Sequence, residues 1–146
     1  MPWLAAKPFV DLQVRILPLP SEERLAARLA PIGYVRSRGS RPDSPGVDRD
    51  IPRGDEEVAD EVWEKRLFVR GEGGAILHVR RADSPWGRYT VRFRDWLRAT
   101  PAARERYEAV KRELSARERG KADFDDCTRA KTAFFDEVQH LFAEDP

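Results

Sequence analysis

The sequence predicts a mixed α/β fold, in which helices cover a β-sheet mainly on one face and the C-terminal half supplies three of them. Three observations predict it. Residues 9–17 alternate apolar and polar side chains, residues 62–80 resemble two strands around a Gly-rich turn, and the hydrophobic period becomes helical from residue 86. The predicted order is one strand, one helix, three strands and three helices.

The first predicted strand, residues 9–17, has two different faces. Between Val10 and Ile16 the alternation is strict, so that apolar and polar side chains fall on opposite sides. The polar side holds Asp11, Gln13 and Arg15. Prolines at 18 and 20 end the strand.

A helix is predicted after this strand. Ser21 is a favourable N-cap, and Glu22 and Glu23 suit the positive end of the helix dipole. Pro31 stops the helix, because proline has no backbone N–H to donate. A short strand is then expected over 32–35.

Two further strands are expected over 62–69 and 75–80, as a hairpin around the glycines of 71–74. Apolar residues then recur at helical spacing. The predicted helices are 86–99, 102–119 and 123–143.

The whole chain, 1–146, is predicted to form a single domain, since a chain of 146 residues can bury one hydrophobic core. Residues 37–57 contain few apolar side chains and three prolines. We therefore predict a flexible loop there, because loops of this length are usually functional lids or disordered insertions.

The charge balance and the cysteine content limit the binding partners and the cellular compartment that can be expected. The chain has 27 basic and 26 acidic residues, whereas nucleic-acid binding needs a basic surplus gathered on one face. Nucleic acid is therefore not expected as a partner. The one cysteine excludes an internal disulfide, and no apolar run approaches the about 20 residues that span a membrane. We expect a cytoplasmic protein with no membrane partner.

The segment LAAKPFVDLQV at residues 4–14 resembles the core motif of the GrpB family. Further matches follow in the same order: KRLFVRG at 65–71, LHV at 77–79, FRDWLRATP at 93–101, Tyr107 with Lys111, and AKTAF at 130–134. Together they span nearly the whole chain. The family's fold resembles that of nucleotidyltransferases, so the resemblance implies a nucleotidyltransferase-like mixed sheet.

The resemblance also implies a metal site. In nucleotidyltransferases a Gly-Ser turn holds the triphosphate, and carboxylates on neighbouring strands bind Mg²⁺, which prefers oxygen ligands. Asp11 would be the first metal-binding carboxylate and His78 would occupy the third position, as a catalytic pair. The second position holds Gln13, a neutral amide. Asp11 can instead be a structural carboxylate paired with Arg15 or Lys7, and His78 a structural histidine.

Two lysines are candidates for binding the phosphate of a ligand. Lys7 lies in an extended segment before Pro8, where it contacts an anion or is simply solvated. Lys131 lies in the apolar stripe of the last predicted helix, where it reaches the same pocket or extends to solvent.

Arg66 is the third candidate for phosphate binding. Lys65 and Arg66 are adjacent on a predicted strand, so only one of them faces the site. Lys65 shares the side of the apolar Trp63, whereas Arg66 shares that of Glu64. We therefore expect Arg66 to face the site.

The resemblance begins after the family's Gly-Ser turn, because Met1-Pro2-Trp3-Leu4 aligns with a Val-Pro-Gly-Leu stretch that follows it. We expect an N-terminally truncated domain, either because the assigned start lies inside the gene or because the homologue is shortened. Such a domain would leave a sheet edge and part of one face uncovered. We therefore expect homodimerisation through that edge.

These observations favour a domain that binds a nucleotide or another phosphate-containing small molecule without catalysis. A single carboxylate beside Gln13 makes a weak Mg²⁺ site. Three alternatives stay open. One is a Mg²⁺-dependent nucleotidyl transfer enzyme, and another is an accessory domain of coenzyme A metabolism, since family members occur joined to dephospho-CoA kinase. The third is a protein-interaction domain that uses the exposed sheet.

Overall fold

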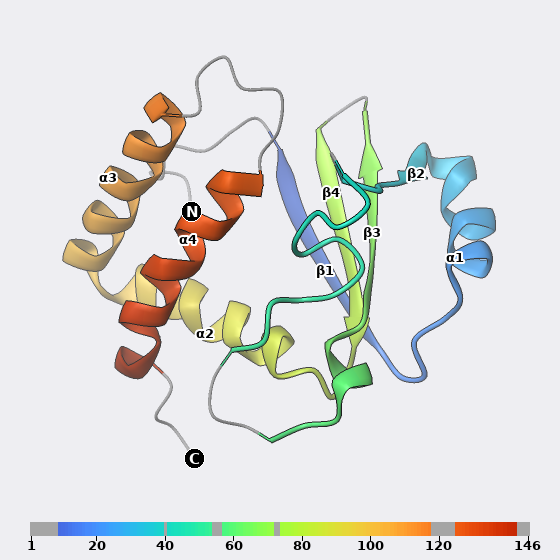
Figure 1. The fold of residues 1–146 in the computed structure, drawn as a ribbon, viewed down its shortest axis with the longest axis horizontal. Helices are drawn as coiled ribbons and strands as arrows, with labels where there is room; N and C mark the ends of the chain where they lie inside the picture. Colours follow the sequence, from blue (N-terminus) through green and yellow to red (C-terminus); the bar gives the residue numbers. More distant parts are fainter. Residues whose placement is uncertain (1–8, 40, 54–56, 72–73, 118–124, 143–146) are drawn as a thin grey trace. The chain divides into compact units, whose positions relative to one another are not determined.

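The computed structural model describes residues 9–39, 41–53, 57–71, 74–117 and 125–142. The chain forms two compact units, which divide between Gly87 and Arg88. The first carries the β-sheet and the second carries most of the C-terminal helices (Figure 1).

The first unit is built on a four-stranded sheet. Its strands are β1 (Val10–Ile16), β2 (Tyr34–Arg36), β3 (Lys65–Arg70) and β4 (Ala75–Arg81). They lie in the order β1-β4-β3-β2, with β1 parallel to β4 and the other neighbours antiparallel. The predicted mixed sheet and its hairpin are confirmed.

Helix α1 (Glu22–Leu29) begins where the sequence predicts it. Ser21 is its N-cap, and Ser21 Oγ accepts a hydrogen bond from the backbone N–H of Arg24 at 3.2 Å. The 3₁₀ turn η1 (Ala30–Ile32) continues the helix. Gly33 ends it with a φ of 85°, a left-handed conformation that favours glycine, and leads directly into β2.

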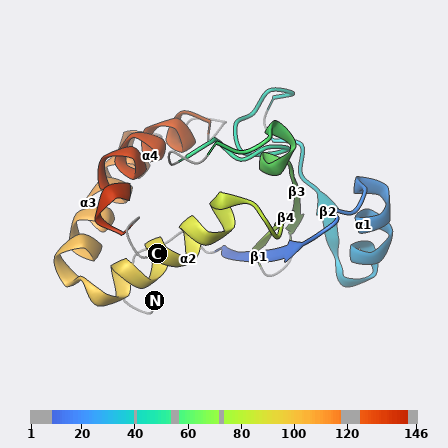
Figure 2. The same ribbon diagram turned by 90° about the horizontal axis from the view of Figure 1, so that it is seen from below.

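One face of the sheet holds the hydrophobic core of the first unit. Phe68 of β3 lies in register with Leu77 of β4, and both point toward α1. The buried cluster consists of Tyr34, Phe68, Leu77 and Val79. Side chains of α1 and of the segment before it pack against this cluster, and α1 lies on one side of the sheet in Figure 2.

The segment 41–53 lies on the other side of the sheet from α1 (Figure 2). Two backbone hydrogen bonds of 2.9 Å attach it, one from the Asp50 N–H to the Trp63 carbonyl and one from the Lys65 N–H to the Asp48 carbonyl. Trp63 belongs to the 3₁₀ turn η2 (Asp60–Trp63). The flexibility expected for residues 37–57 stays a prediction, but the segment's described part follows a defined path that buries Asp50.

The C-terminal half contains the three predicted helices. The predicted fold class, a mixed sheet with three helices in the C-terminal half, is therefore confirmed. They are α2 (Pro85–Ala99), α3 (Pro101–Arg117) and α4 (Asp125–Val138), followed by the 3₁₀ turn η3 (Gln139–Leu141). Phe93 of α2 lies 5.1 Å from the ring centroids of both Tyr107 in α3 and Phe135 in α4. None of the helices in the described ranges has the length and apolar character of a membrane-spanning segment. The expected cytoplasmic location stays a prediction.

Candidate functional site

The strand register gathers polar side chains on the sheet face opposite α1. Gln13 of β1 lies beside His78 of β4, and Lys65 of β3 lies beside Arg80 of β4. Asp11 lies two residues before Gln13 on β1 and therefore shares its face. Three strands thus contribute to one polar surface.

Asp50 lies at the centre of a buried ionic network on this surface. Arg80 donates from Nε to Asp50 Oδ2 at 2.7 Å and from Nη2 to Oδ1 at 3.1 Å, so guanidinium and carboxylate form a two-pronged pair. Lys65 Nζ lies 3.0 Å from the same Oδ1. The side chains of Asp50, Lys65 and Arg80 are 2%, 3% and 4% exposed. Two buried cations therefore share one carboxylate.

His78 connects this network to the rim of the surface. His78 Nδ1 lies 3.4 Å from Lys65 Nζ and 3.3 Å from Arg80 Nη2, and both neighbours are donors. His78 Nε2 lies 3.5 Å from Oδ1 of Asp11, whose side chain is 72% exposed. A neutral imidazole with its proton on Nε2 fits these neighbours. Its Nδ1 can then accept from Lys65 and Arg80, and its Nε2 can donate to Asp11.

Gln13 occupies the position where the resemblance led us to look for a second carboxylate. Its Oε1 accepts a hydrogen bond from Arg80 Nη1 at 2.9 Å, and its Nε2 donates to the Gly87 carbonyl at 3.3 Å. A carboxylate cannot make the second contact, since it has no N–H to donate. The amide therefore orients the guanidinium of Arg80.

Burial sets the protonation states of the network. Burial lowers the pKa of Lys65 to about 8, against the attraction of Asp50. Burial also lowers the pKa of His78, opposed by its hydrogen bond with Asp11. Near neutral pH Lys65 therefore carries a charge and His78 is neutral. An added negative group would raise the pKa values of both.

The structure brings together some of the predicted site residues and separates others. Asp11 and His78 lie together on the polar surface. Arg66 lies on the opposite face, in register with Val79, and its Nη1 donates to the Lys65 carbonyl at 3.0 Å. The expectation that Arg66 lies on the same face as Asp11 and His78 is therefore wrong, and Lys65 lies on that face instead.

The error over Arg66 has a local cause. Assigning Lys65 to the apolar side relied on Trp63, which belongs to η2 rather than to a strand. A side chain in a 3₁₀ turn does not follow the two-residue alternation of β3. Phe68, which is fully buried, shares the face of Arg66 and identifies that face as the core.

The other two phosphate-binding candidates are not tested. Lys7 lies outside the described residues. Lys131 is a half-buried residue of α4, in the helical unit. The ligand-binding roles of both lysines stay predictions, as do the catalytic roles of Asp11 and His78.

Sequence reasoning did not identify Asp50 or Arg80, and it rejected Lys65 in favour of Arg66. Arg80 lies two residues after His78 on one strand, so the strand period could have placed both on the same surface. No comparable signal identifies Asp50. Asp50 belongs to a long irregular segment, and backbone hydrogen bonds hold that segment beside the site. No pattern of residue types in the sequence predicts those hydrogen bonds.

The donor set fits an anion better than Mg²⁺. Within the residues that the structure describes, no group of three or more His, Cys, Asp and Glu side chains is placed to hold a metal ion. Both oxygens of Asp50 contact cations, and Asp11 is paired with a histidine nitrogen. Mg²⁺ requires several oxygen ligands in octahedral geometry, and among the described residues these carboxylates already contact cationic or histidine nitrogens. The expected magnesium site at Asp11 stays a prediction.

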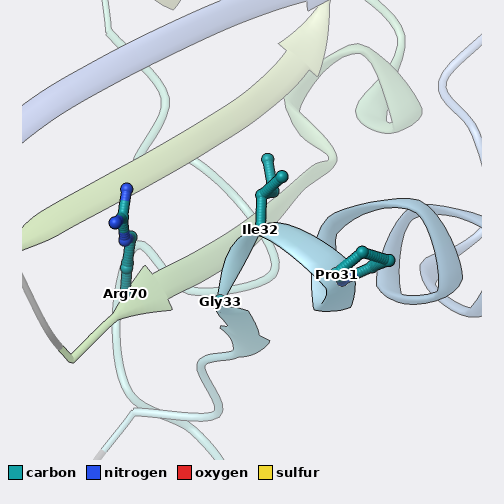
Figure 3. Close-up of a pocket in the computed structure, with 4 residues that line it drawn as sticks. All are labelled: Pro31, Ile32, Gly33 and Arg70. Atoms are coloured by element: carbon teal, nitrogen blue, oxygen red, sulfur yellow. The ribbon is translucent and has the colours of Figure 1, made fainter.

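Two cavities lie on the first unit. One, of about 460 Å³, is lined by Pro31, Ile32, Gly33 and Arg70 (Figure 3). Arg70 is five residues from Lys65 along β3, about 16 Å, so this cavity is separate from the ionic network. The other, of about 370 Å³, is formed by residues of 42–52 and includes Asp50 in its lining. The second cavity therefore adjoins the network.

Comparison with known proteins gives relatives over most of the chain. A dephospho-CoA kinase of Mycolicibacterium paratuberculosis is 31% identical over 138 residues, which cover 92% of this chain and 33% of that protein. A dephospho-CoA kinase of Mycobacterium tuberculosis is 31% identical over 123 residues, which cover 82% and 30%. This chain thus spans about a third of these mycobacterial relatives.

Two shorter relatives match as well. A UPF0157 protein of Halalkalibacterium halodurans is 29% identical over 118 residues, which cover 81% of this chain and 51% of that protein. The crystal structure of the conserved protein GrpB from Enterococcus faecalis shares the fold, with a TM-score of 0.63 and 21% identity, over 94% of this chain and 71% of that one. The expected truncation and the nucleotidyltransferase superfamily placement stay predictions. The family described as GrpB protein matches residues 1–140, and the chain belongs to that family.

Proposed function

We propose that this GrpB-family protein binds a small phosphate-bearing anion on the polar face of the sheet, at Lys65, Arg80 and His78, and that it does so without catalysis. The buried two-pronged pair between Arg80 and Asp50 carries the proposal. In this proposal a ligand phosphate takes the position of the Asp50 carboxylate, which contacts both Arg80 and Lys65. When the ligand binds, its phosphate therefore replaces the Asp50 carboxylate as the partner of Arg80 and Lys65.

The geometry of Arg80 supports a phosphate ligand. A planar guanidinium presents parallel N–H donors that match two oxygens of either a carboxylate or a phosphate. Lys65 adds a point charge beside the same oxygen, and His78 Nε2 can donate at the rim. A phosphate dianion balances both cations, whereas the single charge of Asp50 balances one.

The cavity formed by segment 41–53 lies next to the network. Asp50 lies both in the ionic network and in the lining of the cavity of about 370 Å³ formed by this segment. A volume of this size falls in the range of about 300–1,000 Å³ that small-molecule sites occupy. Withdrawal of Asp50 would open the network toward that cavity.

Nucleotides are the first ligands to test. The resemblance to nucleotidyltransferases favours a nucleotide, and the mycobacterial relatives named dephospho-CoA kinase favour an adenine-containing phosphate ester. In the second case the domain would be an accessory domain of coenzyme A metabolism. Dephospho-CoA therefore belongs among the probes beside AMP, ATP and inorganic phosphate.

Calorimetric titration of the whole chain with these four probes, each with and without Mg²⁺, tests the proposal. We expect binding of at least one phosphate ester with an affinity that Mg²⁺ leaves unchanged, because the described donors do not form a magnesium site. Binding that requires Mg²⁺ and disappears in Asp11→Ala would favour nucleotidyl transfer instead. No binding by any probe would contradict the proposal.

The Asp50→Asn variant tests the exchange of anions. The neutral amide competes less well for Arg80 and Lys65, so the affinity for the phosphate ester should rise about tenfold, equivalent to about 1.4 kcal/mol. Asp95→Asn is the matched control, because it removes one carboxylate charge from α2, in the helical unit, where the side chain is 52% exposed. An unchanged or weaker affinity in Asp50→Asn would show that Asp50 has a structural role only.

A further inference from the structure

Strand β1 exposes an apolar stripe on the α1 side of the sheet. Its even-numbered side chains are all large and hydrophobic, and their exposed fractions range from 39% to 57%. The stripe consists of Val10, Leu12, Val14 and Ile16, with Phe9 and Leu17 at its ends. The adjacent strand β4 buries its own apolar side chains on this face beneath α1. Among the described strands, β1 alone therefore exposes large apolar side chains on this face.

β1 is also an edge strand of the described sheet. Its even-numbered residues bond to β4: the Val10 N–H donates to the Gly74 carbonyl, and the Ile16 carbonyl accepts from the Ala82 N–H. In a parallel ladder the intervening residues direct their backbone groups the other way. The N–H and C=O groups of Asp11, Gln13 and Arg15 therefore point away from β4, toward the outer edge.

In β1 the residues at equal distances on either side of Gln13 are complementary in charge or alike in hydrophobicity. Asp11 lies two residues before it and Arg15 two residues after it, and both side chains are exposed. In an antiparallel pair centred on Gln13, Asp11 of one strand would lie opposite Arg15 of the other. The apolar residues would also match, since Leu12 would lie opposite Val14.

We propose that β1 pairs with β1 of a second copy of this chain, antiparallel and centred on Gln13, to form one continuous sheet. The backbone geometry allows this register, because outward-pointing residues then meet outward-pointing residues and form hydrogen-bonded pairs. The two-fold axis places an Asp11–Arg15 pair at each end of the contact. Opposite charges across an antiparallel pair stabilise it, and like charges destabilise it.

Charge complementarity favours a second copy over an unrelated strand. A strand with the same alternation but a different charge order would leave Asp11 or Arg15 opposite a neutral or like-charged residue. The contact is short, and stable complexes bury about 1,200–2,000 Å². We therefore expect a dimer that dissociates on dilution and weakens as salt rises.

A pair of charge variants tests both the partner and the register. Arg15→Glu gives a strand with two acidic positions, and Asp11→Lys gives a strand with two basic positions. In the proposed register each variant alone brings like charges together, whereas an equimolar mixture pairs acidic with basic residues at both ends. Sedimentation velocity over a range of concentrations measures the outcome, and circular dichroism verifies that each variant is folded.

We expect the unmodified chain to dimerise, each variant alone to be monomeric at the same concentration, and the mixture to form a heterodimer. The double variant Asp11→Lys/Arg15→Glu should dimerise again, because it restores the complementarity with the signs exchanged. A chain that stays monomeric at every concentration would overturn the proposal and leave the edge to another segment or protein. A dimer that persists in both single variants would overturn it too, since a different surface would then form the contact.

Discussion

The two faces of the sheet use the same strands for opposite purposes. On the α1 face, Phe68, Leu77 and Val79 form an apolar core with 8% exposure or less. On the other face, Lys65 and Arg80 are as well buried but carry charges that converge on Asp50. Burial of apolar surface stabilises the fold, whereas burial of ion pairs often contributes little net stability. The contrast indicates that the apolar face maintains the fold, and it supports the proposal that the charged face is retained for binding.

The largest effect is expected for the apolar face. Phe68→Ala should lower the free energy of unfolding by about 4 kcal/mol, because Phe68 is fully buried at the centre of the core and its removal leaves a cavity. Urea unfolding of the variant and of the unmodified chain measures the difference. A loss below about 1 kcal/mol would mean that α1 does not depend on this core.

A slightly smaller loss is expected when the charged face loses its central cation. Arg80→Met should cost about 3 kcal/mol, since Asp50 then keeps only Lys65 as a buried partner and Gln13 loses its acceptor contact. The same urea titration applies. A stabilised variant would show that the network is replaceable by apolar packing and is not a coupled unit.

Lys65→Met should leave stability at pH 7 within about 1 kcal/mol, because Asp50 retains the guanidinium of Arg80 and the buried charge of Lys65 is removed. The variant should differ more clearly in its pH dependence. Between pH 8 and the ordinary lysine value of 10.5, the folded form has released the Lys65 proton while the unfolded chain still binds it. In the unmodified chain, the titration of Lys65 therefore makes the free energy of unfolding rise with pH over this range.

Unfolding titrations of both proteins at several pH values measure this difference. The unmodified chain should gain stability relative to Lys65→Met as pH rises from 8 toward 10.5. Parallel curves would show that Lys65 has an ordinary pKa in the folded protein.

The smallest effect is expected at the β2 edge of the charged face. Val35 shares that face by register with Val69, but it is 62% exposed. Val35→Thr should therefore change the free energy of unfolding by less than about 0.5 kcal/mol. A larger change would mean that the importance of this face extends beyond the ionic network.

The sequence was sufficient for features that local chemistry determines. The Ser21 cap, the alternation of β1 and the pairing of β3 with β4 all depend on neighbouring residues. All three are found in the structure, although β3 begins three residues later than predicted. The close approach of Asp11 and His78 followed from the family resemblance. These features required no knowledge of distant packing.

The candidate site depends on distant contacts and was therefore predicted only in part. Asp50 lies 15 residues before Lys65, and backbone hydrogen bonds from an irregular segment bring them together. The choice of Arg66 over Lys65 failed because the strand begins at Lys65, after a turn that interrupts the alternation. Which face of β3 is the core becomes evident only once Phe68 is seen beneath α1.

Lys65 and Arg66 also offer the most direct test of the central claim, that the charged face binds a phosphate-bearing anion. Lys65→Met and Arg66→Met each remove one positive charge from adjacent positions of β3, but on opposite faces of the sheet. Calorimetric titration with the tightest-binding phosphate ester should show an affinity at least about tenfold lower in Lys65→Met, from the loss of a charged hydrogen bond, and an unchanged affinity in Arg66→Met. Equal losses in both variants, or a loss in Arg66→Met alone, would contradict the account.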